Sequence, residues 1–417
     1  MDIKRDRYLN KLIEKQGNGM IKIITGIRRC GKSYLLFNLF HDHLLSIGTS
    51  PDHIIEVALD DRRNKKLRDP DEMLSYLTGK IQDEGRYFVL LDEVQLMPEF
   101  EDVLNSLLHI RNVDVYVTGS NSKFLSSDVV TEFRGRGDEI RMYPLSFSEF
   151  MSAYPGSVAR GWFEYYNYGG LPLVASAPTA EAKEEYLRAQ FNNVYLSDLF
   201  ERHNIKNREE LDELIDILAS SVGSLTNTKK LSNTFASVKN KIISDKTIKK
   251  YIEYMQDAFL ISRAMRYDIK GKKYINSLLK YYFEDVGLRN ARLNFRQTEE
   301  NHLMENVIYN ELRYRGYNVD FGLVDVYGKD KQGKTVKKRL EVDFIATKGS
   351  KKYYVQSAFS MPTAEKKEQE ERPLLNIGDS FKKIIVVKDD VGVTRDEYGV
   401  VTIGITDFLL DQNSLDF

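Results

Sequence analysis

The feature that most constrains the fold is the stretch "GIRRCGKS", residues 26 to 33. An apolar run, "MIKIITG", precedes it and a helix-like run, "GKSYLLFNLF", follows it. A glycine loop between a buried strand and a helix wraps phosphate, because the backbone can approach the anion and the helix N-terminus points free amides at it. Lys32 would reach the β- and γ-phosphates of ATP, and the Ser33 hydroxyl would ligate Mg²⁺. The residues predicted to bind the nucleotide here are Gly26, Gly31, Lys32, Ser33 and Tyr34.

The first 150 residues contain further apolar runs that favour a parallel sheet. They are "IIEVAL" (54 to 59), "YFVLLDE" (87 to 93) and "VDVYVTGS" (113 to 120), with helix-like segments between them. Runs that are apolar at nearly every position are typical of strands buried on both faces of a sheet that helices cover. We therefore predict an α/β fold with a parallel-sheet P-loop core over residues 1 to 150.

An acidic pair, Asp92 and Glu93, ends the run "YFVLLDE". Such a pair can simply cap the next helix. About sixty residues after a phosphate loop, however, the first acid suits the Mg²⁺ shell and the second suits polarising the attacking water. Asp92 and Ser33 are therefore predicted to hold Mg²⁺, and Glu93 to support hydrolysis of ATP rather than binding alone.

Polar and basic residues downstream offer further contacts to the nucleotide. "VYVTGSNS" ends the strand expected between the two nucleotide-binding strands, and Thr118, Ser120 and Asn121 are its candidates for sensing the γ-phosphate. The alternative is a strand-ending turn. "EFRGRGDEI" then supplies Arg134 and Arg136. An arginine from a neighbouring subunit would stabilise charge in phosphoryl transfer, although arginines in surface loops are usually solvated.

The combination of motifs resembles a widespread prokaryotic family of AAA+ type ATPases. The motifs are "TGIRRCGKS", "LLDEVQ", "VTGSNS", "FRGRG", "PLSFSEF" and "YGGLPLV", and the resemblance covers essentially the whole chain. In that family, a winged helix and a nuclease-like C-terminal domain follow the P-loop module. The resemblance implies a homo-oligomer with nucleotide at the subunit interface, and Arg134 or Arg136 as the finger acting in trans. It also implies that "GGLP", residues 169 to 172, links the nucleotide site to the next helical domain; by itself that tetrapeptide indicates only a turn that stops a helix.

Residues 207 to 280 have the pattern of a winged helix. Helix-like segments at 211 to 221, 229 to 236 and 244 to 257 precede a β-like pair. Lysines cluster within these segments: Lys229, Lys230, Lys239, Lys241, Lys246, Lys249 and Lys250. Such a patch can neutralise DNA phosphates. Winged helices also bind proteins, and lysine is a common solvated residue, so both DNA and protein remain candidate partners.

Residues 281 to 417 have the order of the PD-(D/E)XK nuclease fold. In that fold two carboxylates hold Mg²⁺, and a lysine two residues after the second carboxylate helps activate water. Glu305 and Asp343 match, but Gln356 stands in place of the second carboxylate and Ala358 in place of the lysine. Lys352, four residues before Gln356, is about 13 Å away along a strand. We therefore expect a nuclease-like domain that does not cleave.

Composition limits the remaining alternatives. The chain has 417 residues, a net charge of −1 and a single cysteine, Cys30, which rules out an internal disulfide. No apolar run approaches the ~20 residues of a membrane span, and the N-terminus lacks the apolar core of a signal peptide, so we expect a cytoplasmic protein with no membrane partner.

We predict four parts from this pattern. They are a P-loop core (1 to 150), a helical lid or linker (151 to 206), a winged helix (207 to 280) and a degenerate nuclease-like domain (281 to 417). The predicted function is Mg²⁺-dependent ATP hydrolysis coupled to DNA binding or remodelling. The alternatives are an ATP-regulated nuclease and an ATP-dependent switch or scaffold that acts on protein partners.

Overall fold

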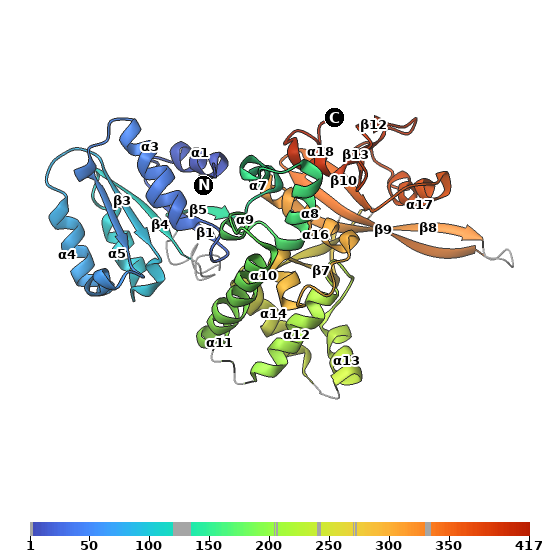
Figure 1. Cartoon of the computed structure of the whole chain (residues 1–417), viewed down its shortest axis with the longest axis horizontal. Helices are drawn as coiled ribbons and strands as arrows, with labels where there is room; N and C mark the ends of the chain where they lie inside the picture. The colour runs from blue at the N-terminus through green and yellow to red at the C-terminus, as the bar shows by residue number, and fades with distance from the viewer. Residues whose placement is uncertain are drawn as a thin grey trace. The chain divides into compact units, whose positions relative to one another are not determined.

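The computed structural model describes residues 3–119, 135–203, 205, 207–239, 243–269, 271, 273–329 and 335–417. Contacts divide the chain into two compact units (Figure 1). The first unit comprises Met1–Pro144 with Gln256–Phe259, and the second comprises Leu145–Met255 with Leu260–Phe417. Each unit has its own sheet, which is described separately below.

The first unit is built on a five-stranded parallel sheet of order β2-β3-β4-β1-β5. Its strands are β1 (Ile21–Gly26), β2 (Ile54–Ala58), β3 (Tyr87–Asp92), β4 (Val113–Thr118) and β5 (Gly137–Met142). Every residue of β1 and β3 is buried, as the continuous apolar runs predict. Because β4 lies between β1 and β3, the ends of these three strands meet at one edge of the sheet, where the sequence places its nucleotide-binding residues.

Helices cover the two faces of this sheet. The helix after the phosphate loop begins as α2 (Lys32–Tyr34), continues as a π-helix, η1 (Leu35–Phe40), and ends as α3 (His41–Ser46). The others are α1 (Asp6–Glu14), α4 (Pro70–Lys80) and α5 (Phe100–Leu107), with short 3₁₀ turns η2 (Pro51–His53), η3 (Arg62–Arg68) and η4 (Val94–Leu96). On α5, Phe100, Val103, Leu104 and Leu107 recur at helical spacing and join the core with β3 and β4.

The second unit contains an eight-stranded sheet of order β12-β13-β11-β10-β9-β8-β6-β7. Its strands are β6 (Ile261–Asp268), β7 (Lys273–Phe283), β8 (Asn318–Lys329), β9 (Thr335–Lys348), β10 (Lys351–Ala358), β11 (Lys382–Val387), β12 (Thr394–Arg395) and β13 (Val400–Gly404). The outer halves of β8 and β9 form a two-stranded arm, seen at the right of Figure 1.

The helices of the second unit fall before, between and after these strands. Before the sheet come α7 (Phe147–Ala153), α8 (Val158–Tyr168), α9 (Pro172–Ala175), α10 (Ala180–Ala189), the π-helix η6 (Gln190–Leu196), α11 (Ser197–His203), α12 (Arg208–Ser220), α13 (Thr228–Lys239) and α14 (Asp245–Asp257). The others are α15 (Val286–Arg292), α16 (Glu300–Tyr314), α17 (Ala364–Leu375) and α18 (Ile405–Leu410).

Two of the predicted domain boundaries fall inside regular elements. Residue 150 lies within α7, which begins at a capping box formed by Ser146 and Glu149. Residue 280 lies within β7, and the β6–β7 hairpin pairs in parallel with β8 through Arg266 and Tyr267. The hairpin predicted as the wing is therefore part of the same sheet as the C-terminal strands.

Candidate functional site

The phosphate loop connects β1 to α2 and has the backbone that its glycines predict. Gly26 and Gly31 have φ of +141° and +99°. A Cβ on Gly26 would lie 2.1 Å from the Met142 carbonyl oxygen, so only glycine fits there. The Lys32 ammonium donates to the carbonyls of Gly26 and Ile27, both at 3.0 Å, and its residue is 5% exposed. The loop therefore encloses a positive charge at the end of β1.

The two residues predicted to hold Mg²⁺, Ser33 and Asp92, come together at this edge. Asp92, the last residue of β3, is buried and hydrogen-bonded to the Ser33 side chain. Burial raises the pKa of Asp92, while the hydrogen bonds from Thr118 and Ser33 act in the opposite direction. A hydroxyl and a carboxylate oxygen are the kind of ligands that Mg²⁺ accepts, so the residues present fit the ion.

Thr118 joins the two acids. It ends β4, is fully buried, and its hydroxyl donates to Asp92 while it accepts a hydrogen bond of 3.1 Å from the Glu93 backbone amide. The sequence offers Thr118 as a sensor of the γ-phosphate. These two hydrogen bonds restrain Asp92 and Glu93, and the role of Thr118 as a sensor stays a prediction.

Glu93 follows β3 in a left-handed backbone conformation, with φ of +54°. A glutamate adopts this conformation only at some energetic cost, and such residues concentrate at functional sites. Its carboxylate is half-buried and accepts a hydrogen bond from the Gln95 side-chain amide. Gln95 was not singled out from the sequence, although the motif "LLDEVQ" contains it.

Arg136 lies at the other end of the sheet. Its carbonyl accepts a 2.8 Å hydrogen bond from the amide of Ile21, the first residue of β1, whereas the phosphate loop follows the last residue. The parallel register pairs Ile21 with Gly137 and Gly26 with Met142, which separates these ends by about 16 Å. Exposed Arg136 is therefore remote from its own phosphate loop. The other candidates, Ser120, Asn121 and Arg134, lie outside the described residues.

The N-terminal segment supports the phosphate loop, a role that the sequence did not reveal. Arg5 is 3% exposed and donates to the Cys30 carbonyl at 3.3 Å and to the Tyr143 carbonyl at 2.6 Å. The Tyr143 amide donates in turn to the Tyr8 hydroxyl at 3.1 Å. Cys30 is fully buried, in agreement with a packing role in the loop.

The "GGLP" turn of the second unit is fixed by a buried carboxylate. Asp285 accepts hydrogen bonds from the amides of Gly170 at 2.8 Å and Leu288 at 3.0 Å, and thereby caps α15. Gly169 has φ of +78°, and a Cβ there would lie 2.3 Å from an Asp285 oxygen. Burial raises the pKa of Asp285 to about 6 despite these bonds. Gly170 is also required, because a Cβ there would lie 2.3 Å from the Leu145 carbonyl oxygen. No local sequence pattern indicates that Asp285 is the partner of this turn.

Two of the residues that the sequence analysis compares with a nuclease centre, Asp343 and Gln356, are also in contact. Asp343 on β9 accepts a 2.9 Å hydrogen bond from the Ser357 amide, and Gln356 on β10 accepts a weak one of 3.4 Å from the Asp343 amide. Ala358 is packed in the apolar core of this sheet. Lys352, four residues before Gln356 on β10, pairs with Asp379 at 3.6 Å. Among the residues that the structure describes, no three His, Cys, Asp or Glu side chains are arranged to hold a metal ion.

Comparisons with known proteins agree with this architecture. Residues 18–151 match a family model described as an AAA domain, and residues 159–299 match a domain of unknown function (DUF8612). A Haemophilus influenzae protein described as "Uncharacterized protein" is 33% identical over 414 residues, which cover 98% of this chain and 98% of that protein. The chain belongs to the family of this Haemophilus protein.

Two more distant similarities extend the comparison. A Methanocaldococcus jannaschii protein, "Uncharacterized protein MJ1544", is 28% identical over 383 residues, which cover 88% of this chain and 81% of that protein. The solved structure of a Walker-type ATPase of Pyrococcus abyssi is 14% identical, with a TM-score of 0.50, over 70% of this chain and 96% of that one. The α/β P-loop fold predicted from the sequence is confirmed. Within the described parts of the chain, no helix has both the length and the apolar character that crossing a membrane requires.

Proposed function

We propose that the AAA domain of this chain binds and hydrolyses ATP. The observation that carries the proposal is that Lys32, Ser33, Asp92 and Glu93 converge at one edge of the sheet, at the ends of β1 and β3. Lys32 binds the phosphates, since its ammonium is held inside the loop that wraps them. Ser33 and Asp92 would hold Mg²⁺, which supplies charge neutralisation at the phosphate oxygens.

Glu93 is the residue proposed to take a proton from the attacking water. Its carboxylate is half-buried and is restrained by Gln95, while its backbone is restrained by Thr118. A carboxylate fixed at a strand end needs little reorganisation to orient one water molecule. Tyr34, 36% exposed on the first turn after the loop, is a further nucleotide-binding candidate.

Turnover of ATP by the purified full-length chain tests this proposal. We expect Mg²⁺-dependent turnover that Lys32→Ala and Asp92→Asn abolish, with loss of ATP binding in Lys32→Ala. The matched control is Lys80→Ala, which removes a lysine at the end of α4, away from the loop. Parental turnover in Lys32→Ala would refute the assignment of the phosphate loop.

We further propose that the active form is a homo-oligomer in which an arginine acts on the neighbouring site. Arg136 is exposed and lies at the edge of its sheet opposite its own phosphate loop. Such an arginine can stabilise transferred phosphate only on another copy of the chain. Arg134 is the other candidate from the sequence.

DNA is the partner that we propose for the second unit. Helices α12, α13 and α14 are followed by the β6–β7 hairpin, and Thr226 bridges to Leu279 of that hairpin. This order suits a winged helix. Exposed lysines lie on two of the helices: Lys229 and Lys230 on α13, and Lys246, Lys249 and Lys250 on α14. Lysines directed at phosphate would give binding that weakens as salt rises and carries little sequence preference.

The test is ATP turnover with and without duplex or single-stranded DNA at low and moderate salt. We expect stimulation that fades as salt rises and that the double variant Lys249→Ala/Lys250→Ala reduces. The control is Lys366→Ala/Lys367→Ala, an adjacent lysine pair on α17 that is ion-paired with Glu370 and Glu371, as Lys249 is with Glu253. Turnover indifferent to every DNA would favour a switch that acts on protein partners.

A further inference from the structure

A buried lysine stands among the nuclease-like carboxylates of the second unit. Lys280 is on β7, and its side chain is 3% exposed. Its ammonium lies 2.8 Å from a Glu305 oxygen and 3.8 Å from an Asp343 oxygen, and it also pairs with Glu341. Three carboxylates from α16 and β9 therefore surround one cation supplied by the chain itself.

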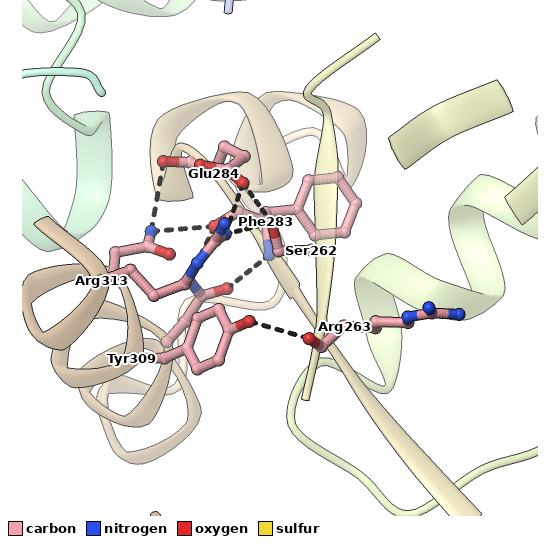
Figure 2. Close-up of polar contacts among 8 residues, drawn as sticks. Ser262, Arg263, Phe283, Glu284, Tyr309 and Arg313 are labelled. Atoms are coloured by element: carbon pink, nitrogen blue, oxygen red, sulfur yellow. Dashed lines mark hydrogen bonds and ion pairs between the residues drawn. The ribbon is translucent and has the colours of Figure 1, made fainter. Parts of the chain in front are cut away.

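The surrounding elements hold these groups in place. Figure 2 shows α16 fixed to the ends of β6 and β7 by Tyr309, whose hydroxyl donates to the Arg263 carbonyl at 3.0 Å, and by Arg313, which pairs with Glu284 at 2.8 Å. Asn306 also binds both backbone polar groups of Phe283, at 2.9 Å and 2.8 Å. Glu305, next to Asn306 in the chain, is thereby directed at β7, where the Tyr282 hydroxyl donates to it at 2.7 Å.

On β9, the other two carboxylates share a face. Glu341 and Asp343 are two residues apart on the strand, so both side chains point the same way. Asp343 is further fixed by the Ser357 amide of β10. β9 and α16 thus place three carboxylates close together, and the Lys280 ammonium forms ion pairs with all three.

The three carboxylates keep the buried Lys280 side chain protonated. Burial acts to lower the pKa of Lys280, but the attraction of Glu305, Asp343 and Glu341 outweighs it and raises that pKa well above its ordinary value. Burial and the neighbouring Glu305 raise the pKa of Asp343. Lys280 is therefore charged at neutral pH, and removing it would leave repelling carboxylates.

The residues present do not fit the Mg²⁺ that the nuclease resemblance implies. Gln356 is a neutral ligand, and its oxygen faces the Asp343 amide. Ala358 offers no group to activate water. The place between the carboxylates, where a cation would bind, is taken by the Lys280 ammonium.

We propose that Lys280 replaces the divalent cation of a nuclease-like centre. The ammonium ties β7, α16 and β9 together as an ion would, so the site binds no metal and does not cut DNA. This inference is independent of ATP hydrolysis, because it concerns only residues of the second unit.

Thermal unfolding of the full-length chain without nucleotide tests the proposal, with Mn²⁺ as the probe. We expect no dependence of the parental Tm on Mn²⁺. Lys280→Ala should unfold at a lower temperature and recover part of the difference in millimolar Mn²⁺. The carboxylates of Glu305, Glu341 and Asp343 do not form a metal site as they stand around Lys280, but removal of the ammonium lets them move onto the ion. The matched control is Lys22→Ala, which removes an equally buried lysine paired with a single carboxylate, Asp114. Lys22→Ala should also unfold at a lower temperature, but Mn²⁺ should not restore its Tm.

A folded Lys280→Ala that responds to Mn²⁺ no more than Lys22→Ala would overturn the proposal. A second measurement decides the question even where Lys280→Ala does not fold. Mn²⁺ binding to the parental chain, followed by its electron paramagnetic resonance signal, should be the same as in Asp343→Ala, and neither protein should cut plasmid DNA with Mn²⁺. Binding or cutting by the parent that Asp343→Ala abolishes would show that Lys280 assists a metal instead of replacing it.

Discussion

Substitution of Thr118 tests how Asp92 and Glu93 are held at the end of β3. Its hydroxyl donates to Asp92 and accepts from the Glu93 amide, and the residue is fully buried. Thr118→Val keeps the shape of the side chain and removes both hydrogen bonds. A hydrogen bond to a charged group contributes about 1.5–3 kcal/mol, so we expect the free energy of unfolding to fall by about that amount.

The same change should alter the pH dependence of ATP turnover. Burial raises the pKa of Asp92, and the Thr118 hydrogen bond is the largest of the effects that lower it. Without this bond the Asp92 pKa rises further, so the carboxylate is protonated at a higher pH. The acidic limb of the turnover profile should therefore move to higher pH in Thr118→Val.

Thr118→Ser is the control, because it keeps the hydroxyl and loses only a methyl group. It should retain the parental pH profile. The assay is steady-state turnover between pH 5 and 9 beside denaturant unfolding of each variant. A Thr118→Val protein with the parental stability and the parental profile would refute this account of the acidic pair.

Two further perturbations examine the oligomer and the "GGLP" turn. Arg136→Ala should reduce ATP turnover by about 10³-fold, as expected for an arginine that acts in trans, and Glu93→Gln alone should also be impaired. A mixture of the two variants should regain turnover, because a Glu93→Gln subunit still supplies Arg136 to an Arg136→Ala neighbour that retains Glu93. Parental turnover in Arg136→Ala alone would exclude this residue as the finger. The neutral form of Asp285 is favoured in the fold, since its pKa is about 6 against an ordinary value of 3.8, so its contribution of about 3 kcal/mol is present below pH 4 and lost as pH rises through 6. Asp285→Asn should flatten the unfolding free energy over this range; an unchanged slope would contradict the assignment.

The core of the first unit could be predicted from the sequence because its signals are local. Strands buried on both faces are apolar at most positions, as β3 is; β1 keeps three isoleucines but also buries Lys22 and Thr25. The phosphate loop requires glycines at fixed spacing, and the acids of "LLDE" follow a strand directly. These patterns also place Asp92 and Ser33 at the same edge of the sheet, since β1 and β3 are parallel strands on either side of β4.

The second unit could be predicted less completely because its decisive contacts join distant segments. The β6–β7 hairpin has an ordinary local pattern, and nothing in it indicates pairing with β8 about fifty residues later. The lone lysine in the apolar run "LLKYYF" is a signal of a buried ion pair, but its partners Glu305, Glu341 and Asp343 are 25 to 63 residues away. Arg5 similarly reaches Tyr143 across 138 positions.

Turnover of ATP by Glu93→Gln, measured beside its affinity for ATP, tests the central claim most directly. The substitution keeps the size of the side chain and an oxygen that can accept the hydrogen bond from Gln95. It removes only the ability to accept a proton. We predict unchanged affinity and turnover reduced by at least about 10²-fold, the usual contribution of a general base. Unchanged affinity with parental turnover would show that Glu93 does not activate water, and that the geometry at the ends of β1 and β3 has been assigned the wrong chemistry.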